Sequence, residues 1–512
     1  MITNRRAAVA STLAGSSFNL LLISVQAVLL IPLYMHYIGP RLYGAWLASG
    51  EILLWLHAFD LGLPSLLLQR IGAAHGRRAV TEVGEWFFSG LVVLGAAALV
   101  VLGAGWGIAV ILPGFFDLPP EEAVLLRDCF LVGAAATALM IASNAVVGLA
   151  RGVQKTGFFA VMTVLGSLAS LLVALGLILA GAGLWAVALG LAARALVIGL
   201  ASIVFVFRGI DAATRAAFAV RRPIVRELAA VSPLTAAGGL SYALMTQSEI
   251  TLIAVLVSPA LAAAYAMTRK AADLGRALLD GVGVATYGSF AHLVASEDAH
   301  RALRVHTQIR RLRLVVAVGL AAAYIAVNAS LVAVWIGPEH YSGFAMTQVF
   351  ALQLVVLGDA YLLNYLYRAT GPVLRGSAAS VVEAAARIPL MIGMVMAFGA
   401  IGAPIATVIT ALAATAIVLR WTHARLRQAT ERAPESPPAS VALLWIAAVA
   451  AASYVGFHVR DGGWLFVVGV GTLIAGSTIV AGVALDPTLR EAPWAIWQTF
   501  RRLSRGVWSS SA

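Results

Sequence analysis

The chain alternates between long apolar segments and short polar segments along its whole length. A transmembrane helix needs about 20 consecutive, mostly apolar residues, and fourteen segments meet that requirement. We expect the spans near residues 13–37, 44–68, 84–112, 128–150, 157–180, 184–207, 229–257, 261–293, 314–336, 344–367, 377–398, 401–420, 441–457 and 464–485. Short glycine-containing turns separate the two closest pairs. The pattern predicts an all-α polytopic membrane protein with about fourteen transmembrane helices.

The basic residues give these spans an orientation. With the N-terminus inside, the outer loops contain only Arg41, Arg127 and Arg460, and five other basic residues lie within spans. The rest of the 35 lysines and arginines fall in inner segments, as the positive-inside rule expects. We therefore predict that both termini are cytoplasmic. The net charge of +12 marks the cytoplasmic face and requires no nucleic-acid partner.

Two polar connectors, at 208–228 and 421–440, divide the spans into groups. The first is basic, and the second contains a Pro/Glu/Ser-rich stretch that is typical of a flexible linker. Both six-span halves begin inside, so a repeat relating them would be parallel. The predicted parts are a six-helix bundle at 1–207, a cytoplasmic amphipathic, basic connector at 208–228, a second six-helix bundle at 229–420, a cytoplasmic linker at 421–440, an extra transmembrane pair at 441–485 and a cytoplasmic basic tail at 486–512.

Composition excludes several classes of protein. Hydrophobic residues make up 61% of the chain and charged residues 11%, whereas soluble domains contain about 25% charged residues. The single cysteine, Cys129, excludes an internal disulfide, and no His/Cys spacing suits a metal. The sequence has no phosphate-binding loop, no serine-nucleophile elbow and no large outer loop for an active site. We expect a protein that is not an enzyme and has no metal or other cofactor.

Four charges share one face of the predicted span 261–293. At about 100° per residue, Arg269, Asp273, Arg276 and Asp280 fall within an arc of roughly 60°. A charge at mid-membrane costs about 3 kcal/mol or more, so such residues face a protein interior or a water-filled cavity. A self-neutralising ladder that only holds helices together is one interpretation. Lys270 lies beside the stripe and leaves a positive excess, which favours an anion-binding site.

Other charged residues within spans extend this set. Arg194 and Arg387 could enlarge a cationic surface, although Arg387 follows Glu383 at i+4, a spacing that also favours a helix-packing ion pair. Glu51 and Glu249 have no basic partner in their own predicted helices, so each needs a partner on another helix, water or a proton. The candidate ion-coupling carboxylates are Glu249, Glu51, Asp273 and Asp280.

Residues 28–78 contain three short motifs in a fixed order: Ile31-Pro32-Leu33-Tyr34, Leu42-Tyr43-Gly44 and Asp60-Leu61-Gly62-Leu63. In this order and spacing, the segment resembles the start of the Wzx-type polysaccharide flippases of the MOP exporter superfamily, which also contains the MATE antiporters and the lipid II flippase. The segment Tyr265 to Lys270 looks like the equivalent in the second half. The resemblance implies two MATE-like six-helix bundles around a central cationic cavity. In having an extra helix pair, at 441–485, the chain resembles the lipid II flippase.

These observations lead to one principal hypothesis and three alternatives. The principal hypothesis is a flippase that moves a polyprenyl-pyrophosphate-linked oligosaccharide across the bacterial inner membrane by alternating access, for cell-surface polysaccharide biosynthesis. Its partners would be that substrate, membrane lipids, and a polysaccharide polymerase or glycosyltransferases. The anion would bind Arg269, Lys270 and Arg276, extended by Arg194 and Arg387. The alternatives are a MATE-like cation-coupled multidrug exporter, a lipid II-type flippase and a membrane-embedded polymerase or ligase.

The predicted orientation can be tested with reporter fusions. A reporter that is active only in the cytoplasm should be active when fused at Ala512 and inactive when inserted near Glu121, because an even number of spans precedes the first site and an odd number the second. Activity on the same side for both fusions would refute the predicted spans.

Overall fold

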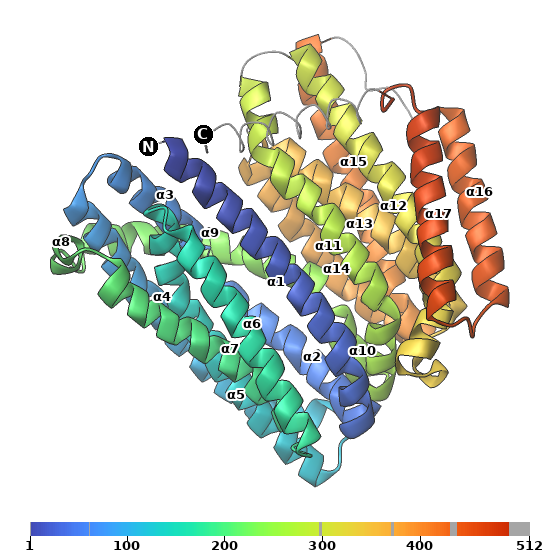
Figure 1. The fold of residues 1–512 in the computed structure, drawn as a ribbon, viewed down its shortest axis with the longest axis horizontal. Helices are drawn as coiled ribbons and strands as arrows, with labels where there is room; N and C mark the ends of the chain where they lie inside the picture. The colour runs from blue at the N-terminus through green and yellow to red at the C-terminus, as the bar shows by residue number, and fades with distance from the viewer. Residues whose placement is uncertain (1, 61, 296–298, 370–372, 431–437, 491–512) are drawn as a thin grey trace, which may run out of the picture. The chain divides into compact units, whose positions relative to one another are not determined.

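The computed structural model describes residues 2–60, 62–295, 299–369, 373–430 and 438–490 (Figure 1). Every predicted span coincides with a helix or with two consecutive helices, and these residues contain no strand. Eleven segments of the described chain are long and apolar enough to cross a membrane, judged by length and composition alone. The all-α polytopic membrane fold predicted from the sequence is therefore confirmed.

The chain packs into two compact units, Met1–Ala264 and Tyr265–Ala512. In the first unit, α4 packs on α5, α6 on α7, and α1 on α6. The predicted division at the connector 208–228 stays a prediction. The helices of the first unit are α1 (Ile2–Tyr37), α2 (Pro40–His57), α3 (Leu63–Gly76), α4 (Val80–Ile111), α5 (Pro120–Gly152), α6 (Thr156–Leu179), α7 (Trp185–Val204), α8 (Ala212–Ala216), α9 (Arg222–Thr246) and α10 (Glu249–Leu256).

Two predicted spans of the first unit are interrupted. In the second predicted span, α2 ends at His57 and α3 begins directly after Gly62. Gly62 has a φ of 63°, a left-handed conformation that glycine adopts without strain. The Oδ1 atom of Asp60 accepts a hydrogen bond from the Gly62 amide at 2.9 Å, which fixes this turn. The seventh span breaks at Gln247 and Ser248, between α9 and α10. Both breaks leave backbone groups that other residues must satisfy.

The predicted basic connector contains the short helix α8. Asp211 caps this helix, because its Oδ2 atom accepts a hydrogen bond from the Thr214 amide at 2.8 Å. The hydrogen bond from the Thr214 amide holds the pKa of the Asp211 carboxyl below its usual value. Arg221 continues the connector and pairs with Glu85 of α4 at 2.6 Å. The connector is thus folded against the first unit.

The second unit is built around α12. That helix packs against α13, α16 and α17, while α15 packs against α13 and α14. Gly399, with φ of 70°, provides the expected sharp turn between α14 and α15, and α15 continues to Thr430, into the predicted linker. The helices are α11 (Pro259–Ala295), which starts in the first unit, α12 (Ala299–Ile336), α13 (Phe344–Ala369), α14 (Val373–Phe398), α15 (Gly402–Thr430), α16 (Ala439–His458) and α17 (Trp464–Leu485).

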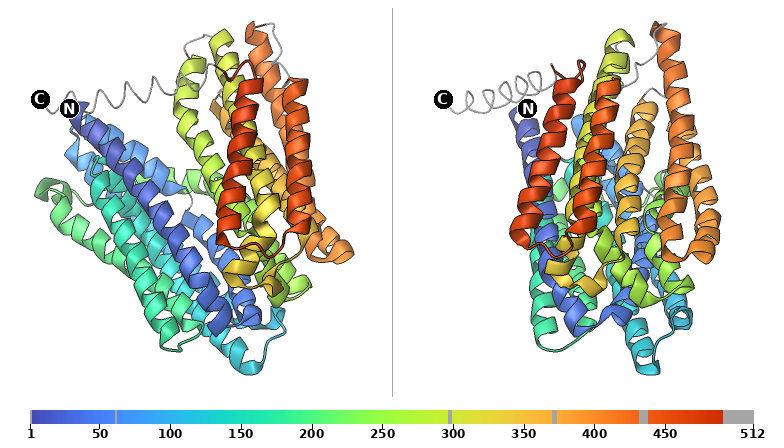
Figure 2. Two further views of the ribbon diagram at one scale, coloured as in Figure 1. Left: turned by 45° about the vertical axis from the view of Figure 1, so that its right-hand side comes forward. Right: turned by 90° about the vertical axis from the view of Figure 1, so that its right-hand side faces the viewer.

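The C-terminal pair, α16 and α17, lies directly against α12 (Figure 2). Glycines allow this close approach. A Cβ atom on Gly456 would lie 2.1 Å from the carbonyl oxygen of Ile325, and one on Gly482 would lie 2.7 Å from a methyl of Val315. At the turn between the two helices, the Ser330 hydroxyl accepts a hydrogen bond from the Gly462 amide at 3.1 Å. The pair is therefore in backbone contact with α12.

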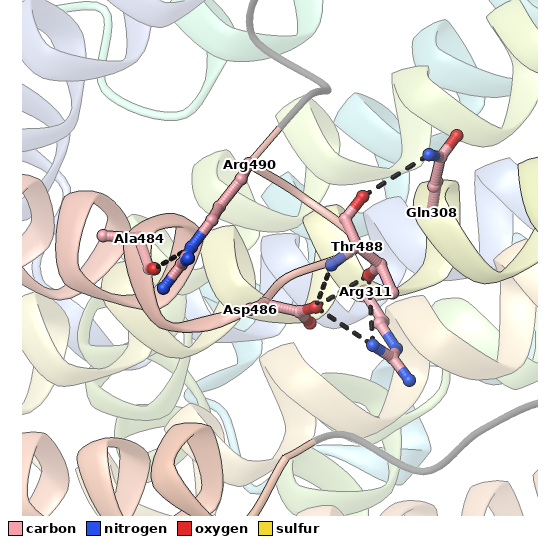
Figure 3. Close-up of polar contacts among 6 residues, drawn as sticks. All are labelled: Gln308, Arg311, Ala484, Asp486, Thr488 and Arg490. Atoms are coloured by element: carbon pink, nitrogen blue, oxygen red, sulfur yellow. Dashed lines mark hydrogen bonds and ion pairs between the residues drawn. The ribbon is translucent and has the colours of Figure 1, made fainter.

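The other end of the pair is fastened to α12 by a buried ion pair (Figure 3). Asp486, just after α17, accepts a hydrogen bond from Nη1 of Arg311 at 3.0 Å, and both side chains are buried. The Thr488 amide and hydroxyl also donate to Asp486, at 2.9 and 2.7 Å. Gln308 of α12 donates to the Thr488 carbonyl oxygen at 3.4 Å. Since breaking such a buried pair costs about 3–5 kcal/mol, the turn holds α17 firmly against α12.

The contact at Gly456 can be tested by adding one methyl group. The variant Gly456→Ala should be destabilised by about 1–3 kcal/mol, because its Cβ overlaps the α12 backbone. The measurement is the thermal unfolding midpoint of the purified protein. Gly469→Ala is the matched control, since a Cβ there meets nothing within 4 Å. Equal midpoints for the two variants would contradict the close packing of α16 on α12.

Candidate functional site

The charged face predicted on α11 is present in the second unit. Nε of Arg269 lies 3.0 Å from Oδ2 of Asp273, and Nη2 of Arg276 lies 3.7 Å from Oδ1 of the same carboxylate. The Arg269 guanidinium also lies 5.5 Å from the ring centroid of the buried Tyr265, a cation–π arrangement. Asp273 is thus shared between two arginines one turn to either side of it.

Hydrogen bonds to Thr268 fix the rotation of α11. Its carbonyl oxygen accepts hydrogen bonds from the Tyr324 hydroxyl at 2.7 Å and from the Asn328 amide at 3.2 Å, both on α12. Its hydroxyl accepts a hydrogen bond from the Ser342 amide at 2.8 Å. Because Thr268 precedes Arg269 directly, these bonds set the direction in which the charged face of α11 points. Buried polar networks of this kind hold one arrangement when they are satisfied.

Helix α12 adds arginines that the sequence analysis assigned to an inner loop. Arg310 donates hydrogen bonds from Nε and Nη2 to the carboxylate of Asp359 on α13, at 3.0 and 2.8 Å. Arg313 is 2% exposed and lies over Gly358 of α13, where a Cβ would come within 1.2 Å of its Nη2 atom. At 100° per residue, Arg310 and Arg313 are about 60° apart on α12. Arg311 points to a different side, toward Asp486.

These residues form one group, which we call the α11–α13 charge cluster. It contains five cations and three carboxylates, so it has a positive excess when all are ionised. Lys270 makes no hydrogen bond or ion pair with any residue that the structure describes. The members are Arg269, Lys270, Asp273, Arg276 and Asp280 on α11, Arg310 and Arg313 on α12, and Asp359 on α13.

Glu51 has a defined role in the first unit. It lies on α2, is 3% exposed, and accepts hydrogen bonds from the backbone amides of Ile250 at 3.3 Å and Thr251 at 2.7 Å. The Thr251 hydroxyl donates to the same carboxylate at 2.8 Å. The carboxylate thus caps the N-terminus of α10 from another helix, where the helix dipole favours negative charge. On the other side of the break, Nε1 of Trp55 donates to the Gln247 carbonyl oxygen at 2.6 Å.

The remaining candidates are Glu249, Arg387 and Arg194. Glu249 is buried as the first residue of α10, beside the two amides that Glu51 caps. Arg387 is fully buried, pairs with Glu383 and donates from Nε to the Thr410 hydroxyl at 2.9 Å, a packing arrangement between α14 and α15. Arg194 belongs to the first unit and packs on Gly166 of α6, and its buried Nε has no hydrogen-bond partner among the residues that the structure describes. A substrate-binding role for Arg387 and Arg194 stays a prediction.

The sequence contained a signal for the cluster members that were missed. Arg310 and Arg313 directly precede an apolar run, and Asp359 lies inside another, so each carboxylate or guanidinium that the membrane encloses needs a partner. Only their pairing across α12 and α13 required the structure. Among the described residues, no group of three or more His, Cys, Asp or Glu could hold a metal ion.

Comparison with solved structures identifies the fold. An inward-facing multidrug resistance MATE family transporter of the MOP superfamily matches with a TM-score of 0.62 and 15% identity, over 79% of this chain and 96% of that one. The lipid II flippase MurJ in an inward closed conformation matches with a TM-score of 0.60 and 11% identity, over 91% and 97%. A MOP superfamily transporter from Pyrococcus furiosus, described as having a binding pocket of reverse polarity, gives 0.60 and 14%, over 83% and 96%.

The chain has the MATE-like fold of the MOP superfamily transporters. No protein-family model matches the sequence, and no curated protein sequence matches it either. The similarity to the solved structures lies in the fold, at identities of 11–15%. The Wzx-type subfamily therefore stays a prediction from the motifs in residues 28–78.

The cap on α10 gives a direct test of Glu51. The variant Glu51→Ala leaves two buried amides and a hydroxyl without their acceptor, which should cost about 1–3 kcal/mol of stability. Glu51→Gln keeps one carbonyl oxygen and should lose less. The thermal unfolding midpoint measures both. Glu82→Ala removes an exposed pair with Arg77 and serves as control, with an expected loss of about 0–1 kcal/mol. A midpoint for Glu51→Ala equal to the control would exclude the capping role.

Proposed function

We propose that the protein is a flippase for a lipid-linked oligosaccharide. The observation that carries the proposal is the positive excess of the α11–α13 charge cluster inside a membrane-spanning bundle. Two of its members, Arg269 and Arg276, share the carboxylate of Asp273, and Lys270 adds a basic group that forms no ion pair with any described residue. Because excess charge is costly at that depth, a bound anion would offset it. The cluster therefore suits a ligand that brings negative charge into the membrane.

A polyprenyl-pyrophosphate sugar has the chemistry that this cluster would recognise. Its tail is apolar, its diphosphate is anionic and its sugar head is polar. Moving the head through hydrocarbon without protein would strip its hydrogen bonds, at a cost of several kcal/mol per group. Arginine forms bidentate, charge-assisted hydrogen bonds with phosphate oxygens, so Arg269 and Arg276 would hold the diphosphate while lysine adds a point charge. Alternating access of the bundles would then move the head between leaflets.

The C-terminal helix pair favours a lipid-linked substrate over a small drug. The lipid II flippase structure matches 91% of this chain, a larger share than the two other transporters, at 79% and 83%. The pair α16–α17 presents large apolar side chains outward, including Leu465, Leu473 and Val480, which suits contact with lipid. This similarity supports a lipid-handling transporter without specifying the sugar.

The second candidate function is a MATE-like cation-coupled exporter of small drugs. It is favoured by the fold similarity to multidrug resistance MATE transporters. A cationic drug would need an acidic site, whereas the α11–α13 charge cluster has more arginine and lysine than aspartate. The Pyrococcus furiosus protein is described as having a pocket of reverse polarity that suggests a different function. On charge alone, we therefore rank the exporter below the flippase.

The proposed setting follows from the arginine distribution. The protein would lie in a bacterial inner membrane with both termini in the cytoplasm, and it would act beside the glycosyltransferases or polymerase that make and use its substrate. It would perform no covalent chemistry itself, and the energy would come from an ion gradient or the membrane potential. One charge moved through 100 mV supplies about 2.3 kcal/mol.

Reconstitution into liposomes tests the proposal. The wild-type protein should move a fluorescent polyprenyl-pyrophosphate oligosaccharide between leaflets, measured by quenching from outside. Arg269→Ala should reduce the rate at least tenfold while the protein remains folded, because the anion loses a charge-assisted contact worth about 1.5–3 kcal/mol. Arg127→Ala, in an exposed outer segment, is the control.

Two outcomes would contradict the proposed site. One is a wild-type flipping rate in Arg269→Ala. The other is recovery of flipping in the double variant Arg269→Ala/Asp273→Ala, since that would make the pair a structural ladder rather than a ligand site. Export of a cationic drug in the same liposomes, without movement of the lipid-linked sugar, would favour the second candidate function.

A further inference from the structure

The three carboxylates of the α11–α13 charge cluster are not equivalent. Asp273 is shared by Arg269 and Arg276, and Asp359 is gripped by Arg310. Asp280 makes no hydrogen bond and no ion pair within 4.0 Å with any described residue, and its Oδ1 atom is buried without a partner. Arg276, one turn away on the same helix, reaches back to Asp273 instead. Asp280 is thus the carboxylate that the cluster leaves unpaired.

Arg313 is the matching unpaired cation. Its side chain is 2% exposed, and neither Nε nor Nη2 has a hydrogen-bond partner among the described residues. Within the same residues, its Nη1 atom lies 3.5 Å from the Val355 carbonyl oxygen, which is a marginal distance for a hydrogen bond. Arg310, three residues earlier, uses the same Nε–Nη2 edge to hold Asp359. The Nε and Nη2 atoms of Arg313 could bind a carboxylate in the same way, but they bind none among the described residues.

The two unpaired groups lie close enough to act on each other. Among the charged groups, Arg276 and Arg313 act electrostatically on Asp280, while Asp359 and then Asp280 act on Arg313. The guanidinium occupies the space over Gly358 because that residue has no side chain. An unpaired buried charge costs several kcal/mol. Direct pairing would satisfy both groups.

We propose that Asp280 and Arg313 form a proton-linked latch. In the open state of the latch Asp280 carries a proton, and a shift of α11 relative to α12 brings its carboxylate onto the Nε–Nη2 edge of Arg313. The proton leaves the carboxyl oxygen for water as the ion pair forms, with no change in oxidation state. When the ion pair opens, the Asp280 carboxylate takes up a proton from water again.

The other titratable groups around Asp280 do not perform this step. On α11, Asp273 is held between two arginines, and on α13, Asp359 is held by Arg310 of α12. Arg276 is a permanent cation, and Tyr361 of α13 acts on Arg276. A group that is already paired gains nothing from a movement of α11 that would break its pair. Among the described residues, the latch therefore resides in Asp280 and Arg313.

The latch deepens the proposed function, on which its consequence for export rests. It would couple proton binding to the movement of α11, the helix that carries the proposed anion-binding residues. Because the two states differ by one proton and one ion pair, proton binding shifts the balance between them by the difference in proton affinity of the two states. The proton-binding step can be measured on the protein alone, without any lipid substrate.

The experiment is infrared spectroscopy of the purified full-length protein across a pH series. A protonated carboxylic acid absorbs separately from a carboxylate. We expect a protonated-carboxyl band near neutral pH that is lost in Asp280→Asn and kept in Asp461→Asn, which changes an exposed aspartate between α16 and α17. In Arg313→Ala the band should persist to a pH at least one unit higher than in wild type, because the ionised form of Asp280 loses its partner. Arg127→Ala should leave the band unchanged.

Two results would overturn the latch: a band that is unchanged in Asp280→Asn, or a pH midpoint that is unchanged in Arg313→Ala. A charge-exchanged variant, Asp280→Arg/Arg313→Asp, addresses folding, because it should recover the expression level that either single exchange reduces. Flipping that fails in wild type while the band behaves as expected would count against the proposed function and support the latch. Normal flipping without the band would do the reverse.

Discussion

The constraint on which the structure depends is that a membrane supplies no partner for a buried charge or backbone group. Every such group must be satisfied by another part of the chain. Arg310 finds Asp359, Arg311 finds Asp486, and the amides at the start of α10 find Glu51. These contacts join parts of the chain that are 49, 175 and 200 residues apart. The polar residues in the spans thus decide which helices pack together, and apolar packing follows.

The positions of the helices could be predicted because hydrophobic length is a local property. Gly181 and Gly399, which have positive φ, stand in the short turns that the sequence predicts between the two closest pairs of spans. The break between α9 and α10 could not be predicted, because the carboxylate that accepts hydrogen bonds from its amides is Glu51 on α2, 200 residues before Thr251. The sequence analysis left Glu51 in need of a partner and could not say that the partner is a helix terminus rather than a proton or a cation.

The candidate site was predictable in part for the same reason. Helical spacing placed Arg269, Asp273 and Arg276 on one face, and the structure pairs them as that spacing suggests. The contribution of α12 was missed, because Arg310 and Arg313 stand at the edge of an apolar run, where basic residues ordinarily mark the cytoplasmic side. The structure shows that α12 starts at Ala299, so these arginines are helical and face other helices. In a cytoplasmic loop, Arg310 and Arg313 would only mark the orientation of the chain, whereas on a helix that faces other helices they belong to a charged site.

The three neighbouring arginines of α12 also determine how motion could spread through the second unit. Arg311 ties α12 to the turn after α17, while Ser330 and the glycine contacts hold the same pair further along the helix. The pair α16–α17 is therefore packed along α12 and bonded to it near both ends. A movement of α12 within the second unit would carry α17 with it. Large apolar side chains of α17, among them Leu465, Leu473 and Val480, are exposed, so such a movement would also displace any lipid that lies against them.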